Sequence, residues 1–166
     1  MKKFLSIFLA TTFLITFFSF NASAAIYDQP LKNEIIISET TEYFEDGSSI
    51  TTTITQQINT GILPMATKTV SGSKTHTAKN ADGDVLFKFK INGTFSVNIG
   101  VSATCTAVSC SASDLASGWS LDSYTTSKSG NKATATGVFK HKVLFITNVT
   151  QEVSTSLSCD KNGVLS

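Results

Sequence analysis

The longest regular pattern in the chain runs from Val85 to Cys105, where apolar and polar side chains alternate one by one. Such alternation puts the apolar side chains on one face of an extended strand, and it indicates half-buried β-structure. Because the run is too long for one ordinary strand, we expect it to fold into a hairpin. Asn98-Ile99-Gly100 is the expected three-residue loop, with Gly100 in the left-handed conformation and Gly93 facing Cys105.

The rest of the chain from residue 67 onward shows the same alternation of apolar and polar residues in shorter segments. Thr and Ser are abundant, and proline occurs only twice. Turn sequences at 80–84, 127–132 and 160–163 separate the alternating segments, whereas 107–117 is small and polar and is expected to be a loop. We therefore predict that residues 67–166 form an all-β domain, an Ig-like antiparallel β-sandwich of about seven strands.

Residues 25–66 are more acidic and less regular. Within them, Glu42–Gln56 is expected to form a β-hairpin around Asp46-Gly47. A lone hairpin is marginally stable, so it either packs on the main domain or serves as a flexible leader or pro-segment. Asn59–Ala66 is expected to be a linker.

The first residues have the organisation of a secretory signal peptide. Lys2 and Lys3 precede an apolar run from Phe4 to Phe20, and Ala22-x-Ala24 supplies a cleavage site. Residues 1–24 are therefore predicted to be removed, which leaves a soluble secreted, extracellular protein that starts near Ala25. An uncleaved signal anchor is the alternative, because the apolar run is close to the minimum length of a membrane span.

The charge of the chain argues against nucleic acid as a partner. Of the thirteen basic residues, two lie in the signal and none is arginine, and the eleven remaining lysines face twelve acidic residues. A nearly neutral surface exerts little attraction on a phosphate backbone. The bidentate arginine contacts that read guanine are absent as well.

The three cysteines are expected to differ in role. Cys105 and Cys159 each end an inward-facing series, so they are predicted to form a disulfide in the oxidising extracellular compartment. Closing that loop of about 55 residues would stabilise the fold by roughly 4 kcal/mol. Cys110 falls in the expected loop and is a candidate free thiol, which could link two chains into a dimer. A zinc site would need about four ligands at characteristic spacings, and a Cys-x-x-Cys redox motif is absent.

Other candidate sites have simpler interpretations. Asn80, Asp82 and Asp84 alternate as calcium ligands do, but no bidentate acid follows at the required distance, so a turn is favoured. Solvated edge charges or a surface patch for an acidic partner or glycan would account for four lysines: Lys88, Lys90, Lys140 and Lys142. No metal site, cofactor site or catalytic constellation is predicted.

Several blocks of the sequence resemble a family of small secreted proteins of clostridia and related Gram-positive bacteria. The resemblance lies in "TKTVSGSKT", "DGDVLFKFKINGTFSVN", "ATCTAVS", "WSLDSYTTSKSGNKATATG" and "VSTSLSCDKNGVLS", with "EYFEDGSSITTTI" similar to the leader hairpin that precedes them. It implies a Gram-positive secreted context and a cysteine pair at Cys105 and Cys159, and it implies no activity. The chain departs from the family pattern by carrying Cys110, and by Phe87 where Trp is common.

Together these features predict a secreted, non-enzymatic β-sandwich that acts as an extracellular binding module. Its expected partner is an extracellular protein, a glycan or a cell-wall polymer. A secreted effector, such as a bacteriocin-like toxin or a hydrolase inhibitor, is the alternative. A hydrolase is least favoured, since it would need His76 or His141 to meet a carboxylate in a cleft.

Overall fold

The computed structural model describes residues 34–58, 67–143 and 146–166. The predicted signal peptide at 1–24 and the expected linker at 59–66 lie outside this part of the chain. The described residues form eight strands: β1 (Glu34–Tyr43), β2 (Ser49–Gln57), β3 (Thr67–Lys79), β4 (Val85–Asn98), β5 (Ser102–Ser113), β6 (Trp119–Ser129), β7 (Lys132–Val143) and β8 (Ile146–Ser158).

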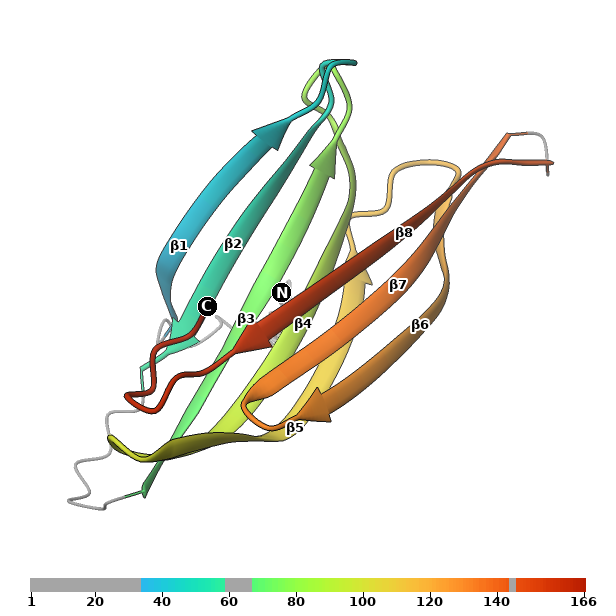
Figure 1. Cartoon of the computed structure of the whole chain (residues 1–166). Coiled ribbons are helices and arrows are strands. Elements are labelled where there is room, and N and C mark those ends of the chain that lie inside the picture. Colours follow the sequence, from blue (N-terminus) through green and yellow to red (C-terminus); the bar gives the residue numbers. More distant parts are fainter. Residues whose placement is uncertain (1–33, 59–66, 144–145) are drawn as a thin grey trace, which may run out of the picture.

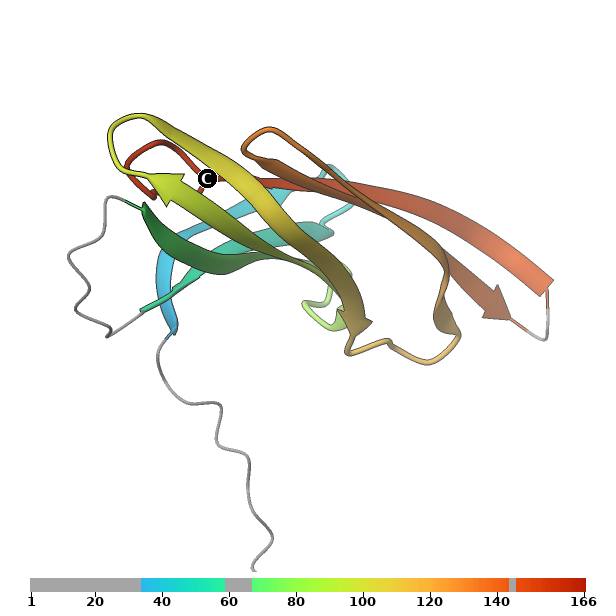
Figure 2. The same cartoon turned by 90° about the horizontal axis from the view of Figure 1, so that it is seen from below.

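The strands make two antiparallel sheets that pack as the layers of a sandwich (Figures 1 and 2). The larger sheet has the order β1-β2-β3-β4-β5, and the smaller has the order β6-β7-β8. The predicted all-β sandwich is thus confirmed, with eight strands rather than about seven. Each strand pairs with its neighbour in sequence, so the chain forms two meanders instead of the Greek key of immunoglobulin domains.

The expected hairpin at Glu42–Gln56 forms and belongs to the larger sheet. Its strands β1 and β2 are joined by a turn in which Gly47 has a φ of 81°. β2 pairs with β3 from Ser49 opposite Lys79 to Gln56 opposite Gly72. The hairpin therefore packs on the main domain, which is one of the two arrangements expected for it.

The hydrophobic core lies between the two sheets and follows the alternation read in the sequence. Its fully buried members on β4 are Phe87, Phe89, Ile91, Phe95 and Val97. From β7, Phe139 stacks on Phe87 with ring centroids 4.0 Å apart, and it meets Phe89 edge-on at 5.7 Å. This aromatic cluster joins the two sheets.

The hairpin of β4 and β5 has a different register from the expected one. Gly100 is left-handed, with a φ of 76°, but the loop is Ile99–Val101 and Asn98 pairs with Ser102. An extra residue, Thr106, bulges out of β5, so that Phe95 faces Cys105 and Gly93 faces Val108. One inserted residue reverses the parity of everything beyond it, so the alternation up to Cys105 does not predict which later side chains face the core.

The expected loop at 107–117 is also wrong in its first half, because β5 continues to Ser113. Beyond the bulge, the side chains that lie against the core are Val108, Cys110 and Ala112. These residues are small and their hydrophobic signal is weak, while serines alternate with them on the outer face. The strand is held by its pairing with β4, which is a non-local interaction.

Candidate functional site

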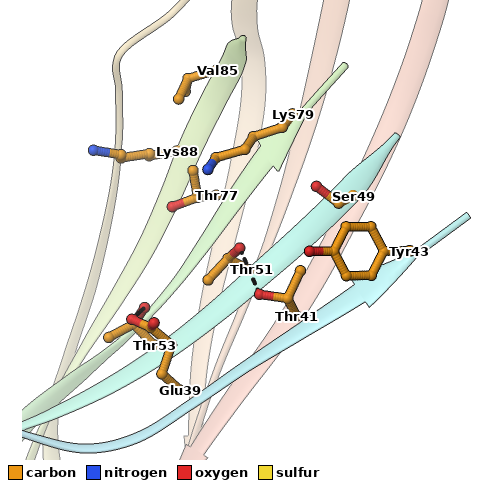
Figure 3. Close-up of a pocket in the computed structure, with 10 residues that line it drawn as sticks. All are labelled: Glu39, Thr41, Tyr43, Ser49, Thr51, Thr53, Thr77, Lys79, Val85 and Lys88. Atoms are coloured by element: carbon orange, nitrogen blue, oxygen red, sulfur yellow. Dashed lines mark hydrogen bonds between the residues drawn. The ribbon is translucent and has the colours of Figure 1, made fainter. Parts of the chain in front are cut away.

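A polar hollow of about 480 Å³ lies on the outer face of the larger sheet, over β1 to β4 (Figure 3). The side chains that line it come from alternate positions of these strands, all pointing away from the core. Small hydroxyl groups dominate the lining: Thr41, Ser49, Thr51, Thr53 and Thr77. Threonine is favoured here because a β-branched residue suits a strand, while its hydroxyl suits a surface exposed to water.

Hydrogen bonds between neighbouring strands order part of this hydroxyl array. The hydroxyls of Thr41 and Thr51 lie 3.0 Å apart across β1 and β2, and the Thr53 hydroxyl donates to the Glu39 carboxylate at 3.2 Å. Each threonine oxygen keeps further capacity to donate or accept. The array can therefore offer hydrogen bonds to a ligand without first being rearranged.

Larger side chains stand at opposite sides of the hollow. Figure 3 shows the ring of Tyr43 on one side and the amino groups of Lys79 and Lys88 on the other, with the threonines between them. Tyr43 is 76% exposed, so its ring is available for contact. Lys88 also forms an ion pair of 2.6 Å with Asp114, which holds its amino group near the rim. The arrangement can bind a polar ligand through hydroxyls, one aromatic ring and charges of both signs.

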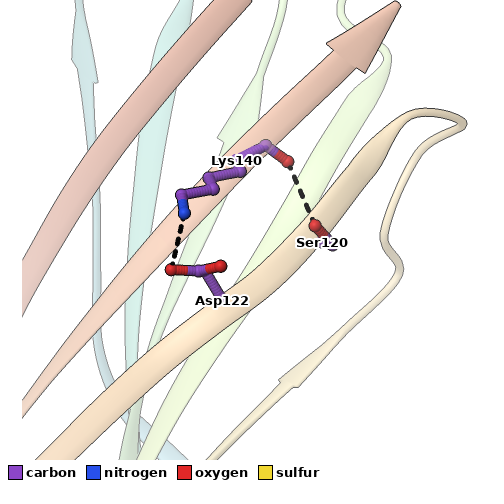
Figure 4. A network of polar contacts seen from close by, with 3 residues as sticks. All are labelled: Ser120, Asp122 and Lys140. Atoms are coloured by element: carbon purple, nitrogen blue, oxygen red, sulfur yellow. Dashed lines mark hydrogen bonds and ion pairs between the residues drawn. The ribbon is translucent and has the colours of Figure 1, made fainter. Parts of the chain in front are cut away.

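The four candidate lysines do not form one patch. Lys88 and Lys90 lie on β4 of the larger sheet, whereas Lys140 and Lys142 lie on β7 of the smaller sheet. Lys88 and Lys90 flank buried Phe89, and Lys140 follows buried Phe139, so these three point outward from the two layers. Lys140 pairs with Asp122 at 2.9 Å, and its carbonyl accepts a bond from the Ser120 hydroxyl at 3.4 Å (Figure 4).

The structure contains no disulfide: Cys105, Cys110 and Cys159 are all free thiols. The predicted bridge between Cys105 and Cys159 is absent from the structure, although both residues are buried in the same core as expected. The two residues flank one turn, because the Cys105 amide donates to the carbonyl of Gly130 and the Cys159 amide to that of Asn131. Each thiol instead contacts a carbonyl nearby in its own segment, at Ala107 and Asp160 respectively.

Cys110 lies on β5 and not in a loop, opposite Ile91 and partly buried against the core. The bulge at Thr106 turns it to the same face as Cys105. Burial raises the pKa of Cys105 and Cys110, and burial together with the Asp160 carboxylate raises the pKa of Cys159 to about 11. All three are thus protonated at neutral pH, which is the opposite of what a nucleophilic cysteine needs.

This placement predicts the thiol reactivity of the native protein. Cys110 should be alkylated first, and Cys105 and Cys159 should react only when the protein unfolds, because reagents cannot reach a buried, protonated sulfur. Mass spectrometry of the native and denatured protein, labelled without reductant, measures both effects. We expect three labels per denatured chain. A count of one, with Cys105 and Cys159 unlabelled, would show instead that they form a disulfide in solution.

The two histidines lie in different sheets, His76 on β3 and His141 on β7. Both ring nitrogens of His76 bond to threonines, Thr52 and Thr155, and not to a carboxylate. The ring of His141 lies 5.2 Å from that of Trp119. Within the described ranges, no three His, Cys, Asp or Glu side chains are grouped so as to hold a metal ion.

Asn80 and Asp84 close the turn between β3 and β4, as expected. The amide of Asp84 donates to the Asn80 side-chain oxygen at 2.8 Å, and the Asn80 amide nitrogen donates to the Asp84 carbonyl at 3.0 Å. Their side chains are thus used in shaping the turn, and Gly83 supplies its left-handed residue with a φ of 87°.

Among the residues that line the hollow, only Lys88 belongs to the candidates predicted from the sequence. The available signal was the threonine on alternate positions of two segments, Thr51 and Thr53 in one and Thr75 and Thr77 in the other. The alternation shows that these residues share a face within each segment. It does not show that the two segments are neighbours in one sheet.

Compared with family models, with curated proteins and with solved structures, the chain gives no match. The resemblance to clostridial secreted proteins accordingly remains a prediction from the sequence blocks themselves. In the part of the chain that the structure describes, no helix has the length and apolar character needed to cross a membrane.

Proposed function

We propose that this protein is a secreted, non-enzymatic binding module that holds a glycan or cell-wall polymer in the hollow over β1 to β4. The observation that carries the proposal is the hollow itself, in which an exposed tyrosine faces two lysines across an ordered array of hydroxyls. A polymer of sugar units offers the complementary groups, since it bears many hydroxyls and alternating apolar ring faces.

The chemistry of each part of the hollow supports this assignment. Tyr43 can stack its ring on the apolar face of a sugar and use its own hydroxyl as a donor or acceptor. The threonines can exchange hydrogen bonds with sugar hydroxyls. Glu39 can accept from a hydroxyl, while Lys79 can meet a carboxylate or phosphate substituent of the polymer.

The open shape of the hollow favours a long ligand over a small molecule. A small ligand is usually enclosed on most of its surface by a largely apolar pocket. Here the lining is mostly polar and lies along strands of one sheet, so an extended chain could run across several strands and gain affinity from repeated contacts.

Replacing Tyr43 with alanine is expected to weaken binding to purified Gram-positive cell wall, or to positive spots on a glycan array, by at least about tenfold. Loss of a central aromatic contact typically has this effect, and tenfold corresponds to about 1.4 kcal/mol. Tyr124→Ala is the matched control, because Tyr124 is also a solvent-facing tyrosine, 60% exposed, on β6 of the other sheet. Quantitative pull-down and array binding of the three proteins provide the measurement.

The proposal fails if the wild-type protein is retained on neither cell wall nor any glycan. It also fails if the two tyrosine variants lose binding equally, because the contact would then not be specific to the hollow. Thr51→Val is a second variant that tests the contribution of the hydroxyl array to binding, since it removes one hydroxyl and keeps the shape of the side chain.

A further inference from the structure

His76 occupies the contact between the two sheets. It lies on the inner face of β3, between Thr52 of β2 and Phe89 of β4. One ring nitrogen, Nδ1, lies 2.9 Å from the Thr52 hydroxyl, and the other, Nε2, lies 2.8 Å from the hydroxyl of Thr155 on β8. A single imidazole therefore connects the larger sheet to the edge strand of the smaller one.

Lys74 makes a second connection beside the first. It lies two residues before His76 on the same face of β3, and its Nζ donates to the carbonyl of Ser156 on β8 at 2.9 Å. Lys132 on β7 is the other cation that acts on this region. Glu42 on β1 shares the inner face but lies two strands away from His76. Among the described residues, no acidic side chain forms an ion pair with Lys74 or His76.

The hydrogen bonds of His76 suit a neutral ring. A neutral imidazole has one donor and one acceptor nitrogen, so one of the two threonines donates to it. A protonated ring has two donors, and that threonine must then turn its proton elsewhere. Thr155 is only 6% exposed, so water has little access to compensate. Burial, together with the charge of Lys74, holds the pKa of His76 below its usual value of 6.5.

We propose that the Thr52–His76–Thr155 connection is an acid-sensitive latch between the two sheets. The neutral imidazole holds β8 on β3, and its protonation beside Lys74 releases β8. The part of the core next to this latch includes Ile54, Leu157 and Leu165, so release exposes apolar surface. The latch lies between the sheets, on the opposite side of β3 from the hollow proposed to bind glycans, and it does not depend on that function.

The direction of the pH effect follows from the two states of His76. In the closed state, with β8 held on β3, the pKa of His76 is lowered. In the open state, with β8 released, the ring is solvated and titrates near its ordinary value of about 6.5. Below that pH the open state binds one more proton than the closed state. Its population therefore rises about tenfold for each pH unit, until the pH passes the closed-state pKa. Above about pH 7 the latch adds no pH dependence.

Hydrogen exchange of the β8 amides at 153–158, measured between pH 7.5 and 5 and corrected for intrinsic rates, tests the latch. The chain has only two histidines, so His141→Gln is a natural control for His76→Gln. We expect opening of β8 to rise as the pH falls below 6.5, by at most about tenfold per pH unit, in the wild type and in His141→Gln, and to stay constant in His76→Gln. Lys74→Met should shrink the effect, because removal of its charge brings the His76 pKa closer to 6.5.

An unchanged acid response in His76→Gln, or its disappearance in His141→Gln instead, would overturn the proposal. A direct titration keeps the test decisive if His76→Gln does not fold. The nuclear magnetic resonance signal of the His76 ring in the intact protein is expected to titrate below 6.5, and a pKa at or above that value would equally overturn the latch.

Discussion

Truncation of Phe139 to alanine is expected to lower the free energy of unfolding by about 3–5 kcal/mol, the usual range for a buried phenylalanine. Phe139 is fully buried, and its ring meets Phe87 face to face and Phe89 edge-on. Because those two rings belong to the opposite sheet, removal of Phe139 leaves a cavity at the contact between the layers. Neither layer can close it without moving as a whole.

Equilibrium unfolding in guanidinium chloride measures this change. Trp119 is the only tryptophan in the chain and its ring lies 5.1 Å from that of Phe87, so its fluorescence reports on the core. Far-ultraviolet circular dichroism provides a second probe that is independent of the local environment of Trp119. Agreement of the two probes would support a single cooperative transition.

Thr136→Ala is the control for this substitution. Thr136 lies on the outer face of the same strand, where its hydroxyl pairs with that of Ser154 at 3.1 Å. Its truncation should cost less than about 1 kcal/mol, the span of β-propensity in a host protein. If Phe139→Ala were no more damaging than Thr136→Ala, the aromatic contact between the sheets would not be a main source of stability.

Substitution of Gly72 by valine is expected to destabilise the protein by about 3 kcal/mol, at the upper end of the range for inserting atoms into a packed core. A β-carbon at Gly72 would collide with the carbonyl oxygen of Thr55 on β2 and with the Leu165 side chain. Gly72 also faces Gly93 on β4. This pair of glycines leaves the space that Leu165, Leu157 and the Phe95 ring occupy.

The loss of stability in Gly72→Val should be concentrated in the pairing of β2 with β3. We expect faster hydrogen exchange in β2 of Gly72→Val than in β4, because the collision with Thr55 interrupts the pairing of the hairpin with the sheet. Thr75→Val is the control, since Thr75 points outward from the same strand and valine has nearly the same shape. Equal exchange in both variants would mean that Gly72 is not needed for the hairpin to dock.

Much of the fold could be predicted from the sequence because local patterning decides which side of a strand is buried. The alternation from Phe87 to Val97 matches the buried face of β4 residue by residue. Turn residues predicted the loops equally well, since Gly47, Gly83 and Gly100 all have the left-handed backbone that their turns require. These features depend on interactions between residues close in sequence.

The failures share one physical cause. The bulge at Thr106 and the continuation of β5 to Ser113 are determined by pairing with β4. Beyond the bulge the alternation rests only on Val108, Cys110 and Ala112, whose small side chains give a weak hydrophobic signal. The assignment of Cys110 to a loop was wrong for the same reason, because the pairing with β4 extends the strand past the bulge.

The candidate site shows the same division. The sequence indicated that Thr51 and Thr53 share one face of their segment and that Thr75 and Thr77 share one face of theirs. Nothing in it places Tyr43 across from Lys79, because the order of strands is a property of the sheet. The contact of His76 with Thr155 joins residues 79 positions apart in different layers.

The sequence by itself determined the all-β class, the inward and outward faces of most strands and the turns, since these follow from local sterics and alternation. The register of β5, the hollow and the link between the sheets were decided only by tertiary packing, which selects among strand arrangements that satisfy the same alternation.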